Sequence, residues 1–133
     1  MRFMLIQSYG GVREGIPPMS EWPQEAVEAH IAAQVAINDE LNERGELVDA
    51  QALSAPAAAK FVVATDAASP AVTDGPYPEA KELIAGYRIV DVESVERALE
   101  IAAETSATPD HEGNPIAQRI EVREVMGTPG ADA

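Results

Sequence analysis

Apolar side chains recur along this chain with two periods, and the alternation between them predicts the order of its secondary structure. Spacing by two residues indicates strands, whereas spacing by three or four residues indicates helices. One helix is predicted from an N-cap at Ser20 to Gly45, and a second follows an N-cap at Ser94. Strands are predicted at 2–9, 46–53, 60–65, 83–91 and 118–126, with a short extended piece at 71–73.

The order β-α-β-β-β-α-β predicts an α+β fold, namely a ferredoxin-like sandwich. Strand 2–9 carries apolar side chains on both faces, so it is expected in the centre of the sheet. The loop between 46–53 and 60–65 predicts an antiparallel hairpin of these two strands. Both helices would cover one face of the sheet. The other face stays apolar, and a second copy of the chain is its expected cover.

The composition fits one small domain. The length of 133 residues is typical of a single domain, and many of the 46% hydrophobic residues are alanines, which predicts a thin core. One domain is expected over 1–126, with a disordered tail at 127–133. The chain has no cysteine, its N-terminus turns polar too early for a signal peptide, and no apolar run reaches the roughly 20 residues of a membrane span. A cytoplasmic protein without a membrane partner is therefore expected.

The charge and the motifs that are missing exclude several classes of function. A net charge of −14 opposes nucleic-acid binding, because phosphate backbones are also negative. The sequence has neither a phosphate-binding glycine loop nor a serine-hydrolase motif, so no nucleotide cofactor and no serine hydrolysis are expected. With two histidines and no cysteine, the chain is not expected to hold a metal ion.

Three polar side chains interrupt the apolar face of the first predicted helix. His30, Gln34 and Asn38 follow one another at intervals of four residues. Buried polar groups cost free energy unless they find hydrogen-bond partners. The three side chains therefore either bond to the neighbouring backbone and to one another, or line a polar pocket between helix and sheet. The arc in which they lie also carries the apolar residues Val27, Ile31, Val35, Ile37 and Leu41.

Two later elements have patterns that assign side chains to faces. In strand 46–53, alternation places Leu47, Asp49 and Gln51 on one face, so the two polar residues would extend the polar patch of the helix. The segment 105–115 is rich in turn-forming residues and is expected to be a loop. The apolar stripe of the second helix consists of Val95, Ala98, Leu99 and Ala102.

A turn and the segments around it resemble a known family. The turn Asp74-Gly75-Pro76-Tyr77 is followed by Glu79-x-Lys81-Glu82 and Gly86-Tyr87, with further matches at Gly45-Glu46-Leu47-Val48 and Ile120-Glu121-Val122-Arg123. In this combination the chain resembles the YCII-related family, in the branch named for its Asp-Gly-Pro-Phe signature, over residues 1–126. Tyr77 stands where the signature has phenylalanine, so an aromatic ring is kept and a hydroxyl is added.

The resemblance implies a dimeric α+β barrel, in which two ferredoxin-like sheets face each other and the helices lie outside. In the founding branch of the family a His–Asp pair has been proposed as the active site. One relative is a dechlorinating enzyme that acts on a hydroxylated aromatic ring. The Asp-Gly-Pro-Phe branch is often encoded beside extracytoplasmic-function sigma factors. His30 lies where the histidine of the family is expected, with Asp49 or Asp74 as its acid partner.

The candidate chemistry is acid–base catalysis. His30 would act as a general acid or base, and Asp49 or Asp74 would fix its tautomer. Asp74 has a second interpretation, because Asp-Gly-Pro is typical of turns: it either stabilises the turn or the dimer, or lies at the rim of a pocket. The metal-free site would therefore contain a histidine and one of two carboxylates.

Further polar residues are candidates for ligand binding. Gln34, Asn38 and Gln51 would hold a small polar or phenolic molecule, and the hydroxyl of Tyr77 would add a hydrogen bond. Arg88 either binds an anionic group of that molecule or forms a surface ion pair with one of the 23 acidic residues.

Two classes of function remain open from the sequence. One is a cofactor-independent lyase, isomerase or dehalogenase that acts on a small polar or aromatic metabolite. The other is a non-catalytic homodimer that binds a ligand or a regulatory partner, in keeping with the sigma-factor association of the branch. An enclosed pocket beside His30 would favour the enzyme, and an exposed apolar patch would favour the partner protein.

Overall fold

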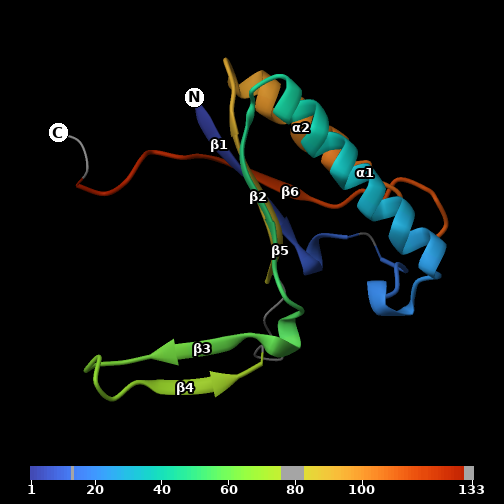
Figure 1. The fold of residues 1–133 in the computed structure, drawn as a ribbon. Helices are drawn as coiled ribbons and strands as arrows, with labels where there is room; N and C mark the ends of the chain where they lie inside the picture. Colours follow the sequence, from blue (N-terminus) through green and yellow to red (C-terminus); the bar gives the residue numbers. More distant parts are fainter. Residues whose placement is uncertain (13, 76–82, 131–133) are drawn as a thin grey trace.

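A four-stranded antiparallel sheet with two helices packed on one face forms the body of the protein (Figure 1). The computed structural model describes residues 1–12, 14–75 and 83–130 of the chain. The helices are α1 (Gln24–Glu43) and α2 (Val95–Ser106), and short 3₁₀ turns are η1 (Tyr9–Gly11), η2 (Met19–Glu21) and η3 (Pro56–Ala58). The strands are β1 (Arg2–Ser8), β2 (Leu47–Ala52), β3 (Lys60–Val63), β4 (Ala71–Asp74), β5 (Ile84–Asp91) and β6 (Ile120–Glu124).

The strand order of the main sheet is β2-β5-β1-β6, which is a ferredoxin-like α+β arrangement, as the sequence predicts. β1 lies inside the sheet, paired with β5 on one side and β6 on the other, in agreement with its two apolar faces. Within one chain the sheet remains open and does not close into a barrel. No helix in the described part of the chain is both long and apolar enough to cross a lipid bilayer.

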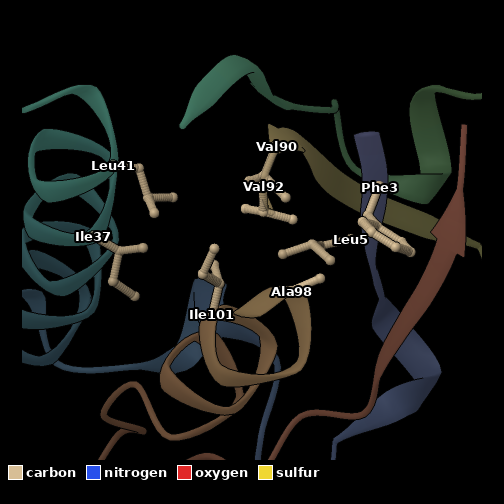
Figure 2. Packing of buried hydrophobic residues seen from close by; sticks show 8 residues of the cluster. All are labelled: Phe3, Leu5, Ile37, Leu41, Val90, Val92, Ala98 and Ile101. Atoms are coloured by element: carbon tan, nitrogen blue, oxygen red, sulfur yellow. The ribbon is translucent and has the colours of Figure 1, made fainter. Parts of the chain in front are cut away.

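The core lies between the sheet and the two helices (Figure 2). Alternation along β1 and β5 directs Phe3, Leu5 and Val90 toward the helices, and their register places Phe3 opposite Val90. α1 adds Ile37 and Leu41 to this core. In α2 the residues that are buried are Ala98, Ile101, Ala102 and Thr105, whereas the predicted stripe members Val95 and Leu99 are 40% and 52% exposed.

The start of α1 differs from the prediction, although its end agrees. Ser20 lies in η2, and Pro23 occupies the N-cap position without a side-chain cap. A proline costs little there, because the first N–H groups of a helix lack intrahelical partners in any case. At the other end Gly45 adopts a φ of +70°, and the Glu46 N–H donates to the Leu41 carbonyl at 2.8 Å. This left-handed glycine turns the chain from α1 into β2.

The predicted hairpin of strands 46–53 and 60–65 does not form. β3 instead pairs with β4 in a separate two-stranded sheet, the β3–β4 ribbon, which projects from the body on the side away from the helices (Figure 1). The turn that closes this ribbon starts at Asp66, whose carboxylate accepts from Ala68 N–H at 3.1 Å and whose carbonyl accepts from Ser69 N–H at 2.9 Å. This local turn pairs β3 with the strand that follows it, and β2 pairs with β5.

The C-terminal region is more tightly folded than the predicted loop at 105–115 suggests. Thr108, Asp110 and Ile116 are buried in it, and Asp110 Oδ1 accepts from the N–H groups of Glu112 and Asn114 at 2.8 and 3.0 Å. The last strand is also shorter than predicted, since β6 spans Ile120–Glu124. The segment 105–115 thereby becomes a fixed wall next to α1.

Candidate functional site

A cavity of about 900 Å³ opens between α1, one end of the sheet and the segment that precedes α1. Its volume lies within the roughly 300–1,000 Å³ that is typical of small-molecule sites. Apolar side chains form much of its lining, and the polar residues lie on α1, β2, β5 and the C-terminal segment. Those polar residues include His30, Gln34, Asn38, Gln51, Arg88 and Gln118.

α1 directs His30, Gln34 and Asn38 into this cavity, because their spacing of four residues places them on one face of the helix. His30 is 9% exposed, and its Nδ1 lies 2.9 Å from the carbonyl oxygen of Pro109. A carbonyl can only accept, so Nδ1 must carry the hydrogen of this bond. In the neutral ring Nε2 is then the unprotonated nitrogen, which can take up a proton.

Trp22 holds the His30 ring from the side. The two rings are 5.7 Å apart at an angle of 89°, an edge-to-face contact. The indole Nε1 donates to the Pro17 carbonyl at 2.9 Å, which fixes Trp22 in turn. The segment before α1 therefore positions His30 as well as lining the cavity.

Arg88 links β5 to both helices. Its Nε donates to Asn38 Oδ1 at 2.6 Å, and its Nη1 donates to Thr105 Oγ1 at 3.1 Å. Its Nη2 donates to Gln34 at both the side-chain oxygen, at 2.7 Å, and the backbone carbonyl, at 3.1 Å. Gln34 Nε2 lies 3.4 Å from Thr108 Oγ1, a long contact that extends the network to the C-terminal wall.

The surface ion pair considered for Arg88 does not occur. Arg88 is only 5% exposed, and its described hydrogen-bond partners are all neutral. Burial lowers the pKa of the guanidinium, because desolvation disfavours the charged form. Even a lowered arginine pKa leaves the group protonated at neutral pH. The wall of the cavity therefore carries a positive charge with no described carboxylate beside it.

Asp49 lies on the sheet face that points away from the helices. A β-bulge between Leu47 and Asp49 shifts the register, so Leu47 packs on the core whereas Asp49 pairs with Ile89. The shared face that simple alternation predicts is therefore wrong, because one extra residue reverses the faces. On that outer face Asp49 accepts from Tyr87 Oη at 3.0 Å and from Gln51 Nε2 at 2.9 Å. The hydrogen bond to Asp49 raises the pKa of the Tyr87 phenol.

Asp74 ends β4 on the β3–β4 ribbon, where it forms an ion pair with Lys60 and its side chain is 81% exposed. Tyr77 lies outside the described residues. In the described part of the chain, the hydrogen-bond partner of His30 is thus the Pro109 carbonyl and neither of the two aspartates. Five of the eight predicted site residues line one cavity, namely His30, Gln34, Asn38, Gln51 and Arg88, although the side chain of Gln51 bonds to Asp49 on the outer face.

Several residues of the site were not predicted from the sequence. Thr105 continues the buried stripe of α2 one turn beyond Ala98 and Ile101. A polar residue on an apolar stripe is a sequence signal for a buried polar site, on α2 as on α1. Trp22 is the single tryptophan of the chain, and it is 7% exposed. Thr108 lies in a segment without periodicity, and Gln118 begins the last predicted strand; only the folded chain places them next to α1 and β1.

No group of three histidine or acidic side chains among the described residues has the arrangement of a metal site. The arrangement instead combines a histidine with a fixed tautomer, a buried cation and an apolar lining. Such a set can bind a small organic molecule and move a proton on it.

Comparison with known proteins identifies the family of the chain. The profile of the YCII-related domain matches residues 1–126, which is nearly the whole chain. A comparison with curated protein sequences gives no match. On the profile match, this chain belongs to the YCII-related domain family.

Proposed function

We propose that the protein is a cofactor-independent acid–base enzyme that acts on a small, partly apolar molecule bound in the cavity beside α1. The observation that carries this proposal is the hydrogen bond from His30 Nδ1 to the Pro109 carbonyl. It leaves Nε2 of the neutral ring unprotonated on a side chain that lines the cavity. In an isomerase the proton returns to another atom of the substrate, whereas in a lyase or a dehalogenase a C–H bond and the bond from a neighbouring carbon to the leaving group, such as halide, break as a double bond forms.

In this proposal His30 Nε2 accepts a proton from a C–H or O–H group of the substrate. The resulting imidazolium keeps its Nδ1 hydrogen bond to Pro109, so the ring does not have to turn during the reaction. The edge contact with Trp22 restrains the ring further. The same nitrogen then returns the proton to another atom of the substrate or to water. A backbone carbonyl takes the orienting role for which Asp49 or Asp74 was considered.

The test is the exchange of C–H hydrogens for deuterium in D₂O, followed by proton NMR on a panel of small keto acids and hydroxylated aromatic acids. We expect the wild type to accelerate exchange in at least one member of the panel. His30→Gln should lower that rate by about 10²–10⁴-fold, since it removes the proton-transferring group. His111→Gln is the matched control: it changes the only other histidine, which does not line the cavity. An unchanged rate in His30→Gln would contradict the proposal.

The proposal includes a homodimer formed through the outer face of the main sheet. Both helices lie on one face of the sheet, and no helix of the described residues covers the opposite face (Figure 1). Alternation and register place Met4, Ile6, Tyr87 and Ile89 in the middle of that outer face. A second copy laid on it would bury this apolar strip, and the pair would work in the cytoplasm, as a chain without cysteine suggests.

A second candidate function is a non-catalytic regulatory protein. It is favoured by the β3–β4 ribbon, on which Val62, Val63 and Val72 are 63%, 67% and 53% exposed. Exposed apolar side chains on a projecting strand pair are typical of surfaces that bind another protein. Ligand binding without any accelerated exchange, in both the wild type and His30→Gln, would favour this function over the enzyme.

A further inference from the structure

The buried guanidinium of Arg88 donates hydrogen bonds to neutral groups, but no described carboxylate neutralises its charge. Arg88 is 5% exposed, and its described partners are two amide side chains, a hydroxyl and a backbone carbonyl. A buried cation normally pairs with a carboxylate, because leaving it unpaired costs several kcal/mol. The chain has 23 acidic residues, and none of the described ones reaches Arg88.

A single aspartate in place of Asn38 would neutralise the charge of Arg88. Asn38 Oδ1 lies 2.6 Å from Arg88 Nε. An aspartate in the same place has nearly the same shape and would put a carboxylate on the guanidinium. The position carries the neutral residue instead, on a wall of the cavity.

Hydrogen-bond donors also remain at this place. A guanidinium has five N–H groups, and the four described bonds use one on Nε, one on Nη1 and two on Nη2. One Nη1–H therefore has no described protein acceptor. The Asn38 side chain accepts from Arg88 with its oxygen, which leaves its Nδ2 as a donor without a described acceptor. Both residues line the cavity.

The apolar part of the cavity lies on the same helix. Ile31 and Val35 on α1 are 52% and 48% exposed and line the cavity on either side of Gln34 in the sequence. Contact of these exposed branched side chains with an apolar ligand surface lowers the free energy of binding, because apolar surface is removed from water. The cavity therefore combines a cationic end and an apolar wall.

We propose that the ligand of this cavity is a small organic anion, with a carboxylate as the counter-ion of Arg88 and an apolar body against Ile31 and Val35. This inference rests on the proposed function for the cavity, and it adds the chemical class of the substrate. A carboxylate suits the position because its oxygens only accept hydrogen bonds, whereas Arg88 and Asn38 offer donors. Arg88 on β5 binds the substrate, and His30 on α1, which lines the same cavity, acts on it.

The first experiment compares two probes of one shape on the wild-type protein. Benzoate and benzamide differ in charge but are nearly equal in size, so the cavity distinguishes them only through its electrostatics. In a titration followed by NMR, we expect benzoate to shift the side-chain signals of Gln34, Asn38 and Arg88, with a Kd at least tenfold lower than that of benzamide. Equal affinities, or no shift with benzoate at tens of millimolar, would overturn the proposal.

The second experiment supplies the counter-ion from within the protein. Asn38→Asp should raise Tm, weaken benzoate binding at least tenfold, and change benzamide binding less than twofold. Asn42→Asp is the matched control: it adds the same charge one turn further along α1, at an exposed position outside the cavity lining. We expect it to change benzoate affinity less than threefold, because solvent screens exposed charges.

The other outcomes of the second experiment decide against the proposal. If Asn38→Asp lowers Tm or does not fold, Arg88 is already neutralised and needs no anionic ligand. If it raises Tm but binds benzoate as the wild type does, Arg88 is a purely structural link between β5 and the helices.

These two experiments test the anion site separately from catalysis by His30. Selective benzoate binding with no effect of His30→Gln on exchange would support the anion site and contradict catalysis by His30. Accelerated exchange that His30→Gln abolishes, with equal binding of benzoate and benzamide, would support the enzyme and contradict the anion site.

Discussion

Two arginines of this chain lie in opposite environments, and the difference separates a structural role from the proposed binding role. Arg97 on α2 faces the carboxylate of Glu46, with Nε to Oε2 at 3.0 Å and Nη2 to Oε1 at 2.9 Å. This is a two-point ion pair, and both side chains are mostly buried, at 13% and 15% exposure. Arg88 has no such partner among the described residues. The sequence around the two arginines does not separate them, because the partners come from distant segments.

The Glu46–Arg97 pair should make stability depend on pH. The hydrogen bond from Arg97 lowers the pKa of Glu46 below its ordinary value of 4.5. A lowered pKa stabilises the fold at pH values above the ordinary pKa, and this contribution is lost as the pH falls through the folded-state pKa. We expect Glu46→Gln to lower the free energy of unfolding by about 1–2 kcal/mol at pH 7. The difference from the wild type should begin to shrink below about pH 4.5, where Glu46 is protonated in the unfolded chain, and disappear below the lower folded-state pKa, as urea titrations at several pH values would measure.

Glu100→Gln is the control for this prediction. Glu100 contacts the same arginine, but its side chain is 67% exposed. An exposed ion pair contributes little because water and salt screen it. A loss in Glu100→Gln as large as in Glu46→Gln would show that position and burial do not determine the strength of these pairs.

At the scale of elements, the sequence predicts what depends on local pattern and misses what depends on a single residue or on distant packing. The apolar spacing in 2–9, in α1 and in 83–91 suffices to predict the core strands and the helix. The bulge at β2 leaves no trace in that pattern, yet it moves Asp49 to the other face. On α2 the predicted stripe includes Leu99, which is 52% exposed, and omits Ile101, which is fully buried, because contact with the sheet decides which of these neighbouring apolar residues is covered.

The candidate site follows the same division. The sequence predicts that His30, Gln34 and Asn38 lie on one face of a helix, because a spacing of four residues is a local property of the chain. Their partners Pro109, Thr108 and Arg88 come from two other segments, so no sequence pattern could connect them. The two candidate acid partners of His30, Asp49 and Asp74, required a long-range contact that no local pattern specifies.

β2 and β5 approach closely at Gly86. A Cβ added there would lie 2.7 Å from the backbone oxygen of Gln51, closer than side chains tolerate. We expect Gly86→Ala to force the two strands apart and to lower the free energy of unfolding by about 1–3 kcal/mol, measured by urea unfolding. Gly45→Asn is the control, because Gly45 has open space and a φ of +70°, which asparagine accepts. It should cost less than about 1 kcal/mol. Equal losses would show that crowding at Gly86 is not the cause.

At the scale of the whole molecule, the two faces of the sheet have different surroundings. The helices pack on one face (Figure 1) and bury Phe3, Leu5 and Val90 there. On the other face, β1 and β5 carry an apolar strip. Charged residues border this strip on β6, where Glu121 and Arg123 pair with Ile6 and Met4. An apolar centre with a charged margin is typical of a protein interface. The β3–β4 ribbon projects away from the helices, so a partner on the outer face would lie within its reach.

The proposed homodimer can be tested at the centre of this strip. Ile89 is partly buried within one chain and faces outward, next to Tyr87 on the same strand. Ile89→Glu would bury a carboxylate in the interface, which costs several kcal/mol and should raise the dimer Kd more than about 100-fold. We expect the wild type to elute as a dimer and Ile89→Glu as a folded monomer in size-exclusion chromatography with light scattering. Leu99→Glu, a substitution at a 52% exposed position on α2, should leave the dimer intact. A wild type that is monomeric at 100 μM, about a hundred times a micromolar Kd, would rule out this interface.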